Sequence, residues 1–345
     1  MKIINTVLGD ATGGRWQVVL DYTEVLTSLG HEVLLVAEQS KVSSTTVLPK
    51  HGELKTLRNS GHYDFLASFK ARRLVKSWKP DLIIAHCSRS VAVMKRAARG
   101  SIKVVGVSHS NNVKRMTYAD AFFNISTHIE SEINRLGGLG KPAFNIPNMA
   151  HFKKDITFNP KPWNDPPIIG AFGRLDPVKG FHHYIYALGI LKQRNISFKA
   201  ILGGDGEQRD ELVASINQLG LNADVKLTGW VDDTERFLSS IDLLCVPALS
   251  DAFGLTPLDG AISSTPMVIS NATGHLDMFE DNVSALFFDK QSPEQLADVL
   301  EYALSAQDKL GYMANAAFDR VVNEYNEEKF RDNLSHAIAF LAPGL

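Results

Sequence analysis

Apolar runs of four to seven residues recur along the chain, separated by segments in which apolar residues repeat at helical spacing. The runs lack the alternation of a half-exposed strand, which favours strands buried on both faces of a parallel sheet. Strands are predicted over residues 2–8, 32–37, 82–86, 103–107, 121–125, 143–146, 167–172, 198–202, 225–228, 242–247, 266–270 and 285–288. Strands that alternate with helices indicate the α/β class.

Helical spacing is found between most of these strands. Helices are predicted over residues 18–29, 65–78, 89–99, 127–135 and 181–194, over a segment that ends at Leu219, and over 293–305, 309–323 and 327–341. Residues 40–64 carry too little pattern to assign.

The alternation of strands and helices starts twice, which predicts two domains. Residues 151–166 are rich in lysine, proline and asparagine and are predicted to link them. We expect an N-terminal Rossmann-like domain over residues 1–155 and a C-terminal one over 156–345, with the last helix packing back on the first domain. Candidate site residues occur in both halves, so we expect the site in a cleft between the domains.

Composition is that of a globular protein, with 345 residues, 44% hydrophobic and 21% charged. Cys87 and Cys245, the two cysteines, both lie in apolar runs and are predicted to be core residues in a reducing compartment. No apolar run approaches the ~18 residues of a membrane span, and the apolar stretch before Gly9 is too short for a signal peptide. We therefore expect a cytoplasmic location.

The charge is distributed unevenly. Residues 1–160 contain 22 Lys and Arg against 12 Asp and Glu, whereas residues 161–345 contain 14 against 26. Ten of the basic residues lie between Lys70 and Lys103, where Asp81 is the one acid. This basic region favours either contact with an anionic membrane surface or an anionic acceptor, although a solvated helix face is the plain alternative.

The segment 250–269 carries the densest candidate chemistry. Asp251 follows a predicted strand, the triplet Phe253-Gly254-Leu255 forms a glycine turn that could open a helix, and Asp259 lies eight residues after Asp251. Free N–H groups at a helix start attract a diphosphate, and carboxylates accept hydrogen bonds from sugar hydroxyls. The alternative is that both acids only cap and solvate an ordinary helix.

This segment resembles the E-x7-E motif of retaining glycosyltransferases of family 4, with Asp in place of both Glu residues. The resemblance implies two Rossmann-like domains in the GT-B arrangement. It also implies that Asp251 binds the donor sugar, that Asp259 binds the ribose hydroxyls, and that Phe253, Gly254 and Leu255 allow close approach of the backbone to the donor.

The stretch 173–180, G-R-L-D-P-V-K-G, resembles the family's G-R-L-x-x-x-K-G motif. The resemblance implies that Arg174 and Lys179 hold the diphosphate, the first bidentately and the second as a point charge, and stabilise charge on the departing nucleotide. Gly204 lies in a loop similar to the family's G-x-G, and Val231 in a segment whose backbone contacts the base. Trp230 could pack in the core or stack on a base.

In the N-terminal half, Gly13 and Gly14 match a glycine pair that approaches the donor diphosphate, and the G-D-A-T-G-G loop lacks the dinucleotide G-x-G-x-x-G spacing. His86 and His109 each follow a predicted strand, so position alone does not separate them. The resemblance favours His109, which matches the family's histidine near the donor sugar and acceptor.

These features predict a retaining transferase that moves a sugar from a nucleoside-diphosphate sugar to a glycan or glycolipid hydroxyl, in cell-surface glycan or lipopolysaccharide synthesis. The predicted catalytic residues are His109, Asp251, Arg174 and Lys179. No metal, no other cofactor and no nucleic-acid partner is expected. Two alternatives stay open: an epimerase or hydrolase of related fold, and a non-catalytic sugar-binding or scaffold protein, which the two Asp-for-Glu differences suggest.

Overall fold

The computed structural model describes residues 1–9, 13–42 and 48–343, and the chain divides into two compact units. The first unit comprises Met1–Asn148 with Glu328–Leu345, and the second comprises Met149–Glu327. The boundary between the units thus lies a few residues before the domain boundary predicted at residue 155. Nearly all of the last helix belongs to the first unit.

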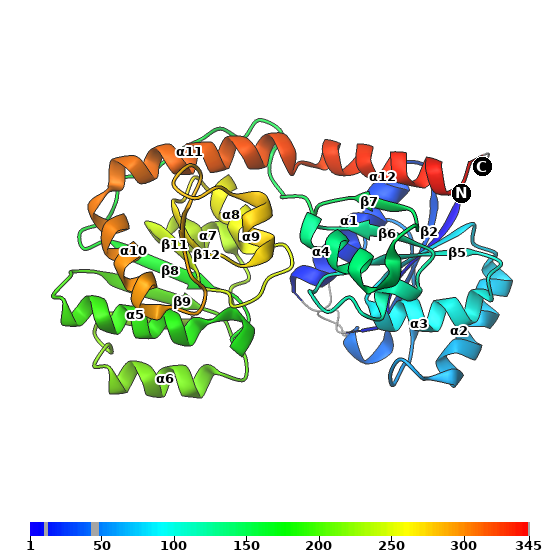
Figure 1. Ribbon diagram of the computed structural model, residues 1–345, viewed down its shortest axis with the longest axis horizontal. Coiled ribbons are helices and arrows are strands. Elements are labelled where there is room, and N and C mark those ends of the chain that lie inside the picture. The colour runs from blue at the N-terminus through cyan, green and yellow to red at the C-terminus, as the bar shows by residue number, and fades with distance from the viewer. Residues whose placement is uncertain (10–12, 43–47, 344–345) are drawn as a thin grey trace. The chain divides into compact units, whose positions relative to one another are not determined.

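The first unit is built on a seven-stranded sheet in the order β3-β2-β1-β4-β5-β6-β7, and every pair of neighbours is parallel (Figure 1). The strands are β1 (Lys2–Val7), β2 (Glu32–Glu38), β3 (Glu53–Leu57), β4 (Leu82–His86), β5 (Lys103–Val107), β6 (Ala121–Asn124) and β7 (Ala143–Asn145). The helices are α1 (Gly14–Ser28), α2 (Phe65–Trp78), α3 (Ser88–Ala98), α4 (Thr127–Ile133) and α12 (Glu327–Leu341).

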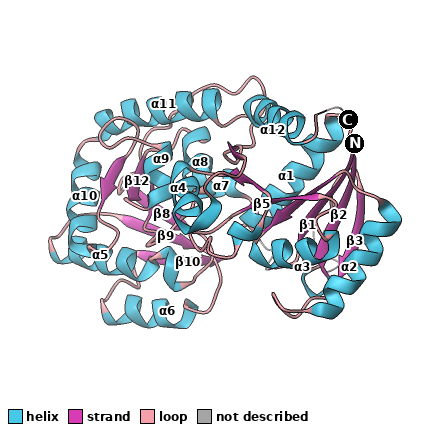
Figure 2. Cartoon of the chain, turned by 45° about the vertical axis from the view of Figure 1, so that its right-hand side comes forward, coloured by secondary structure: helices cyan, strands magenta, loops and turns pink. Residues whose placement is uncertain are grey.

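The second unit repeats this plan with six strands in the order β10-β9-β8-β11-β12-β13, again all parallel (Figure 2). The strands are β8 (Ile168–Phe172), β9 (Lys199–Gly203), β10 (Val225–Gly229), β11 (Leu243–Val246), β12 (Met267–Ser270) and β13 (Leu286–Phe288). The helices are α5 (Phe181–Gln193), α6 (Arg209–Gln218), α7 (Thr234–Ser239), α8 (Leu255–Ile262), α9 (Thr273–Met278), α10 (Pro293–Ser305) and α11 (Gln307–Glu324).

Each sheet has one point at which the strand order reverses. It lies between β1 and β4 in the first unit and between β8 and β11 in the second. In open parallel sheets, ligands bind at such switch points, outside the carboxyl ends of the strands. The loops that follow these four strands are therefore the places to look for a site in each unit.

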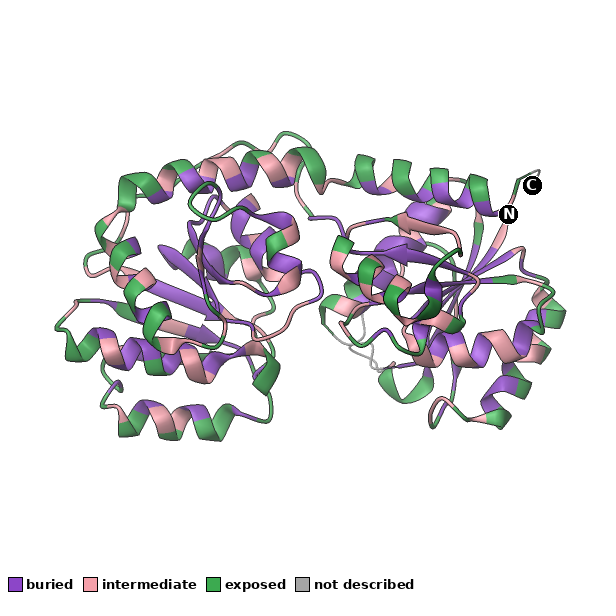
Figure 3. Ribbon diagram, in the orientation of Figure 1, coloured by how far each residue is buried: buried purple, intermediate pink, exposed green. Residues whose placement is uncertain are grey.

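The burial of the strands explains why continuous apolar runs in the sequence predict them. All five residues of β4 are buried, and the strands of both units form the buried interior in Figure 3, with exposed residues on the outer faces of the helices. Asp64 begins α2 by accepting a hydrogen bond from the Ala67 N–H, and Ser126 begins α4 in the same way. Among the described helices, none combines the length and the apolar character that crossing a membrane requires.

Most predicted strands and helices match the structure within two or three residues, and α2, β4, β5 and α12 match in full. Three elements were missed. Strand β3 is largely exposed and lacks an apolar run, and α7 and α9 are each only six residues long.

Candidate active site

Lys179 and Asp251 form an ion pair at the switch point of the second unit. Lys179 Nζ lies 2.9 Å from Asp251 Oδ2, and both side chains are largely buried. Asp251 Oδ1 also accepts a hydrogen bond from the Phe253 N–H at 3.2 Å. Burial tends to raise the pKa of Asp251, but the charge of Lys179 and these hydrogen bonds outweigh it, so the pKa lies below its ordinary value. Asp251 is therefore a carboxylate.

The loop that carries Lys179 is docked on the segment after β11. The Leu249 N–H donates to the Val178 carbonyl at 2.9 Å. Gly180, which follows Lys179, has a φ of +68°, and a Cβ added there would lie 2.0 Å from the Pro247 carbonyl oxygen. Only glycine fits this contact. Gly180 thus allows the close contact that holds Lys179 beside Asp251. Lys179 and Asp251 are 72 positions apart in the sequence.

Gly254 begins α8 with a φ of +114°. A Cβ there would lie 2.9 Å from Cδ2 of His275, which is fully buried beneath it. The first N–H groups of α8 have no partner within the helix, as at any helix start, and their dipole favours an anion. Phe253 is buried and packs edge-on against Tyr325, with ring centroids 5.8 Å apart. The start of α8 is thus held by packing on both sides.

His275 was not predicted from the sequence. Its Nδ1 lies 3.0 Å from the Ser270 carbonyl oxygen, which can only accept, so Nδ1 carries the proton and Nε2 is an acceptor. Nε2 is buried without a hydrogen-bond partner among the described residues. A single histidine in α9, a helix of six residues, gives no sequence signal, because its role depends on the tertiary contact with Gly254.

Asp259 lies in the second turn of α8 and is partly buried. Burial raises its pKa to about 7, and the charge of His151 lowers it only in part. It is thus a carboxyl group that changes charge near neutral pH, unlike Asp251.

Arg174 follows β8, as Lys179 does. Its Nε lies 2.6 Å from Asp176 Oδ2, and its side chain is 55% exposed. The guanidinium is therefore accessible and partly neutralised by its own loop. The sequence pattern did not indicate this pairing with Asp176.

The remaining predicted residues of the second unit lie at the ends of neighbouring strands. The Gly204 N–H donates to the Gly229 carbonyl at 2.6 Å, which joins the loop after β9 to the end of β10. Val231 packs against Gly203. Trp230 is 54% exposed, so of its two predicted roles, packing in the core is wrong.

In the first unit, Gly13 precedes α1 and Gly14 is its first residue, and both are exposed. Residues 10–12 of this predicted loop lie outside the described residues. Arg15 follows in the same turn, and its charge acts on both His86 and His109. Arg15 was not among the residues predicted from the sequence, because only the fold brings its charge near His86 and His109.

His86 and His109 are partners rather than alternatives. His86 Nδ1 lies 2.8 Å from His109 Nε2, and the rings are nearly parallel with centroids 5.1 Å apart. Burial, together with the charge of Arg15, lowers the pKa of His109 to about 3. The pKa of His86 also lies well below its ordinary value, chiefly through burial. Both rings are neutral at physiological pH, so one donates to the other.

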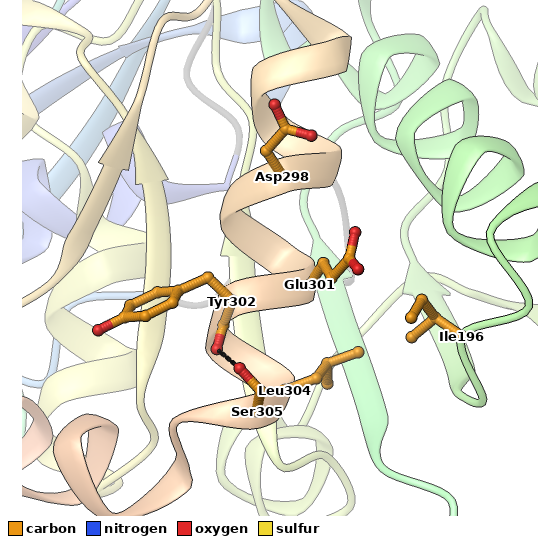
Figure 4. Close-up of a pocket in the computed structure, with 6 residues that line it drawn as sticks. All are labelled: Ile196, Asp298, Glu301, Tyr302, Leu304 and Ser305. Carbon is orange, nitrogen blue, oxygen red and sulfur yellow. Dashed lines mark hydrogen bonds between the residues drawn. The ribbon is translucent and has the colours of Figure 1, made fainter.

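A surface pocket beside α10 contains none of the predicted site residues (Figure 4). It is lined by Ile196, Asp298, Glu301, Tyr302, Leu304 and Ser305. Asp298 and Glu301 both pair with Arg194, at 2.8 and 2.7 Å. Two carboxylates would repel a diphosphate, so this pocket is not assigned to the donor.

Both halves of the chain match known families. Residues 12–136 match the family described as Glycosyltransferase Family 4, and residues 153–320 match Glycosyl transferases group 1. The chain is 24% identical over 280 residues to the lipopolysaccharide core biosynthesis glycosyltransferase LpsE of Rhizobium meliloti, covering 80% of each chain. It is 28% identical over 166 residues to the O-antigen biosynthesis glycosyltransferase WclY of Escherichia coli, covering 48% of this chain and 45% of WclY.

Solved structures share the fold over almost the whole chain. Anabaena HepE, in complex with UDP and glucose, superposes with a TM-score of 0.84 at 19% identity, covering 98% of this chain and 99% of that one. The lipopolysaccharide outer core galactosyltransferase WaaB, in its apo form, gives 0.79 at 17% identity, covering 98% and 99%. The predicted GT-B fold, with two parallel-sheet α/β domains, is confirmed.

Proposed function

We propose that this chain, which belongs to the glycosyltransferases of family 4, transfers a sugar from a nucleoside-diphosphate sugar to an acceptor hydroxyl with retention of the anomeric configuration. The observation that carries the proposal is the Lys179–Asp251 pair at the switch point between β8 and β11, beside the start of α8. That arrangement offers an ammonium and free backbone N–H groups to a diphosphate, and a carboxylate to sugar hydroxyls.

The donor is proposed to bind through Arg174 and Lys179, which contact the diphosphate, and through Asp259, which accepts hydrogen bonds from the ribose hydroxyls. Gly254 and Leu255 bring the start of α8 close to the phosphates. Asp251 keeps acceptor capacity for the donor sugar, because a carboxylate can accept about four hydrogen bonds and the protein uses two. Gly13, Gly14, Gly204 and Val231 complete the proposed donor contacts.

The proposed step is a front-face substitution. The bond between the anomeric carbon and the phosphate oxygen breaks, and the acceptor oxygen bonds to the same face of that carbon. The acceptor's proton passes to the leaving phosphate, so no carboxylate nucleophile is needed. Lys179 and Arg174 stabilise the charge that develops on the leaving diphosphate, without a metal ion. His109, neutral at physiological pH, lines the reacting face of the first unit.

The proposed acceptor is a bacterial cell-surface glycan or glycolipid of the lipopolysaccharide or O-antigen type. Two relatives support this choice, LpsE and WclY, which are named for lipopolysaccharide core and O-antigen biosynthesis. HepE, which shares the fold, was solved with UDP and glucose, so UDP-sugars are the first donors to test.

Contact with an anionic membrane is proposed through α2. Phe65, Leu66 and Phe69 are 70%, 77% and 54% exposed, and the Arg73 guanidinium lies 4.6 Å from the centroid of the Phe69 ring. Lys70 and Arg73 are exposed on the same helix. Large apolar side chains beside basic ones are typical of helices that lie in the surface of an anionic bilayer.

A donor assay tests the proposed function. The protein is incubated with UDP-glucose, UDP-galactose or UDP-N-acetylglucosamine, with and without a lipopolysaccharide extract from a strain that lacks this protein. We expect UDP release that depends on the extract, and a product whose new linkage has the donor's α configuration by NMR. Equal release without the extract would favour the hydrolase, and conversion of the donor into an epimeric nucleotide sugar without UDP release would favour the epimerase. Neither release nor conversion with any donor would favour the non-catalytic alternative.

A further inference from the structure

Three arginines surround His62 in the first unit. Arg115 Nη1 lies 3.0 Å from His62 Nδ1, and Arg96 Nη2 donates to the His62 carbonyl. Burial lowers the pKa of His62, and the charges of Arg115, Arg89 and Arg96 lower it further. These four residues are called the arginine cluster below.

The guanidinium groups of this cluster have neutral partners. Arg96 Nε donates to Ser68 Oγ at 2.8 Å, and Arg89 Nη1 donates to the Leu8 carbonyl at 3.4 Å. Arg89 Nε is buried and has no hydrogen-bond partner among the residues that the structure describes. Within the part of the chain that the structure describes, none of the three forms a salt bridge with a carboxylate.

The nearest acid along the chain is already engaged. Asp64 lies two residues after His62, but its carboxylate caps α2 and accepts hydrogen bonds from Ser60 and Ala67. Three like charges around one imidazole repel one another, and a buried donor without a partner costs free energy. Both costs are relieved when an anion binds.

The cluster lies at the switch point of the first sheet. Leu8 follows β1, Arg89 lies in the first turn of α3 after β4, and Arg115 follows β5. His62 Nε2 lies 2.9 Å from the hydroxyl of Ser88, the first residue of α3. These loops leave the same edge of the sheet as His86 and His109, because the strands are parallel. A group bound here therefore lies on the face that also presents His109.

We propose that the arginine cluster binds an oxyanion, the phosphate or carboxylate of an anionic sugar residue in the acceptor. The proposal rests on the proposed function, whose donor diphosphate is assigned to the second unit, and it names the acceptor's chemistry. Tyr63 favours a sugar: its ring is 73% exposed, beside the Arg115 guanidinium at 5.9 Å, and offers a flat face for a pyranose ring. Guanidinium groups are suited to bidentate binding of phosphate and carboxylate.

Arg115→Gln is the test variant, because Arg115 is exposed and its loss leaves the core intact. Lys76→Gln is the matched control: it removes one exposed positive charge from the same unit, away from His62. The readout is the imidazole ¹H–¹⁵N signal of His62, assigned by its disappearance in His62→Gln. This signal reports on the cluster alone, even though phosphate can also bind the donor site.

Inorganic phosphate and glucuronate are titrated into the wild type and both variants. We expect at least one of these anions to shift the His62 signal saturably in the wild type and in Lys76→Gln. The affinity of Arg115→Gln for that anion should be lower by about tenfold or more. No shift, or equal affinity in Arg115→Gln, would overturn the proposal. Shifts with phosphatidylglycerol vesicles but with neither small anion would also overturn it, in favour of a lipid headgroup.

Parallel titrations with UDP, GDP and ADP, followed by the melting temperature, separate the two proposals. A His62 response without a response to any of the three nucleotides would contradict the proposed donor site and support the oxyanion site. A response to a nucleotide without a His62 response would overturn the oxyanion site alone.

Discussion

Lys179 Nζ and Asp251 Oδ2 are 2.9 Å apart, on opposite sides of the point where the strand order of the second sheet reverses. The sequence motifs assigned both residues to one ligand, but they gave no sign that the residues pair with each other. The pair changes what a substitution does, because each partner neutralises the other in a largely buried setting.

On the sequence alone, Lys179→Ala is expected to leave stability nearly unchanged. The ion pair predicts otherwise: the variant leaves Asp251 partly buried and unpaired, which should lower the free energy of unfolding of the second unit by about 1–3 kcal/mol. Chemical denaturation measures this. Asp251→Asn in the Lys179→Ala background should recover part of the loss, and strictly additive effects of the two substitutions would show that the pair contributes nothing.

Gly180 and Gly311 form a matched pair of glycine substitutions. Gly180→Ala should destabilise the second unit by more than about 2 kcal/mol, because its Cβ would meet the Pro247 carbonyl at 2.0 Å in a backbone conformation with φ +68°. Gly311 lies in α11 with open space around it, so Gly311→Ala should be neutral or stabilise by about 0.5–1 kcal/mol. Similar melting temperatures for the two variants would refute the docking of the Lys179 loop.

The pKa of about 7 at Asp259 predicts opposite effects of pH on stability and on binding. Between its ordinary pKa, 3.8, and about 7, the folded state holds a proton that the unfolded state has lost, so its contribution to stability falls as pH rises through this range. Asp259→Asn should remove this slope, as measured by melting temperatures from pH 4 to 8.

Nucleotide affinity should instead rise with pH, because the ionised carboxylate accepts hydrogen bonds from the ribose diol. The ratio of the affinity for UDP at pH 8 to that at pH 6 should be larger in the wild type than in Asp259→Asn, by up to about tenfold. The comparison cancels the titration of the phosphate itself, whose second pKa is about 6. Parallel pH profiles in the two proteins would remove Asp259 from the donor site.

Membrane contact through α2 is tested with the double variant Phe65→Ser/Leu66→Ser. The control is Tyr312→Ser on α11, a large and similarly exposed side chain in the second unit. Sedimentation with phosphatidylglycerol vesicles should show binding of the wild type and of Tyr312→Ser, weaker binding at high salt, and a loss of about tenfold or more in the α2 variant. Unchanged sedimentation of the α2 variant would exclude this helix as the contact.

The sequence predicted what depends on local pattern. Buried strands such as β4 and amphipathic helices such as α2 were predicted with their boundaries, because burial sets the spacing of apolar residues. Strand β3 was missed because an exposed strand does not require that spacing.

The site was predicted as a set of motifs, while its contacts were not. The hydrogen bond between His86 and His109 joins residues 23 positions apart, and His275 acquires its place only by packing under Gly254. Arg115 and His62 lie in loops without any motif. They come together only because α2, which follows His62, packs on α3, and α3 contacts β5 and the turn that follows Arg115.

Binding of a nucleoside diphosphate to the second unit is the central claim, and calorimetric titration of UDP, GDP and ADP tests it most directly. The proteins are the wild type, Lys179→Ala and the control Lys226→Ala, which removes an exposed lysine on β10. We predict that at least one nucleotide binds the wild type and Lys226→Ala with equal affinity. Its affinity for Lys179→Ala should be lower by about tenfold or more. Binding of none of the three, or equal binding by Lys179→Ala, would contradict the claim.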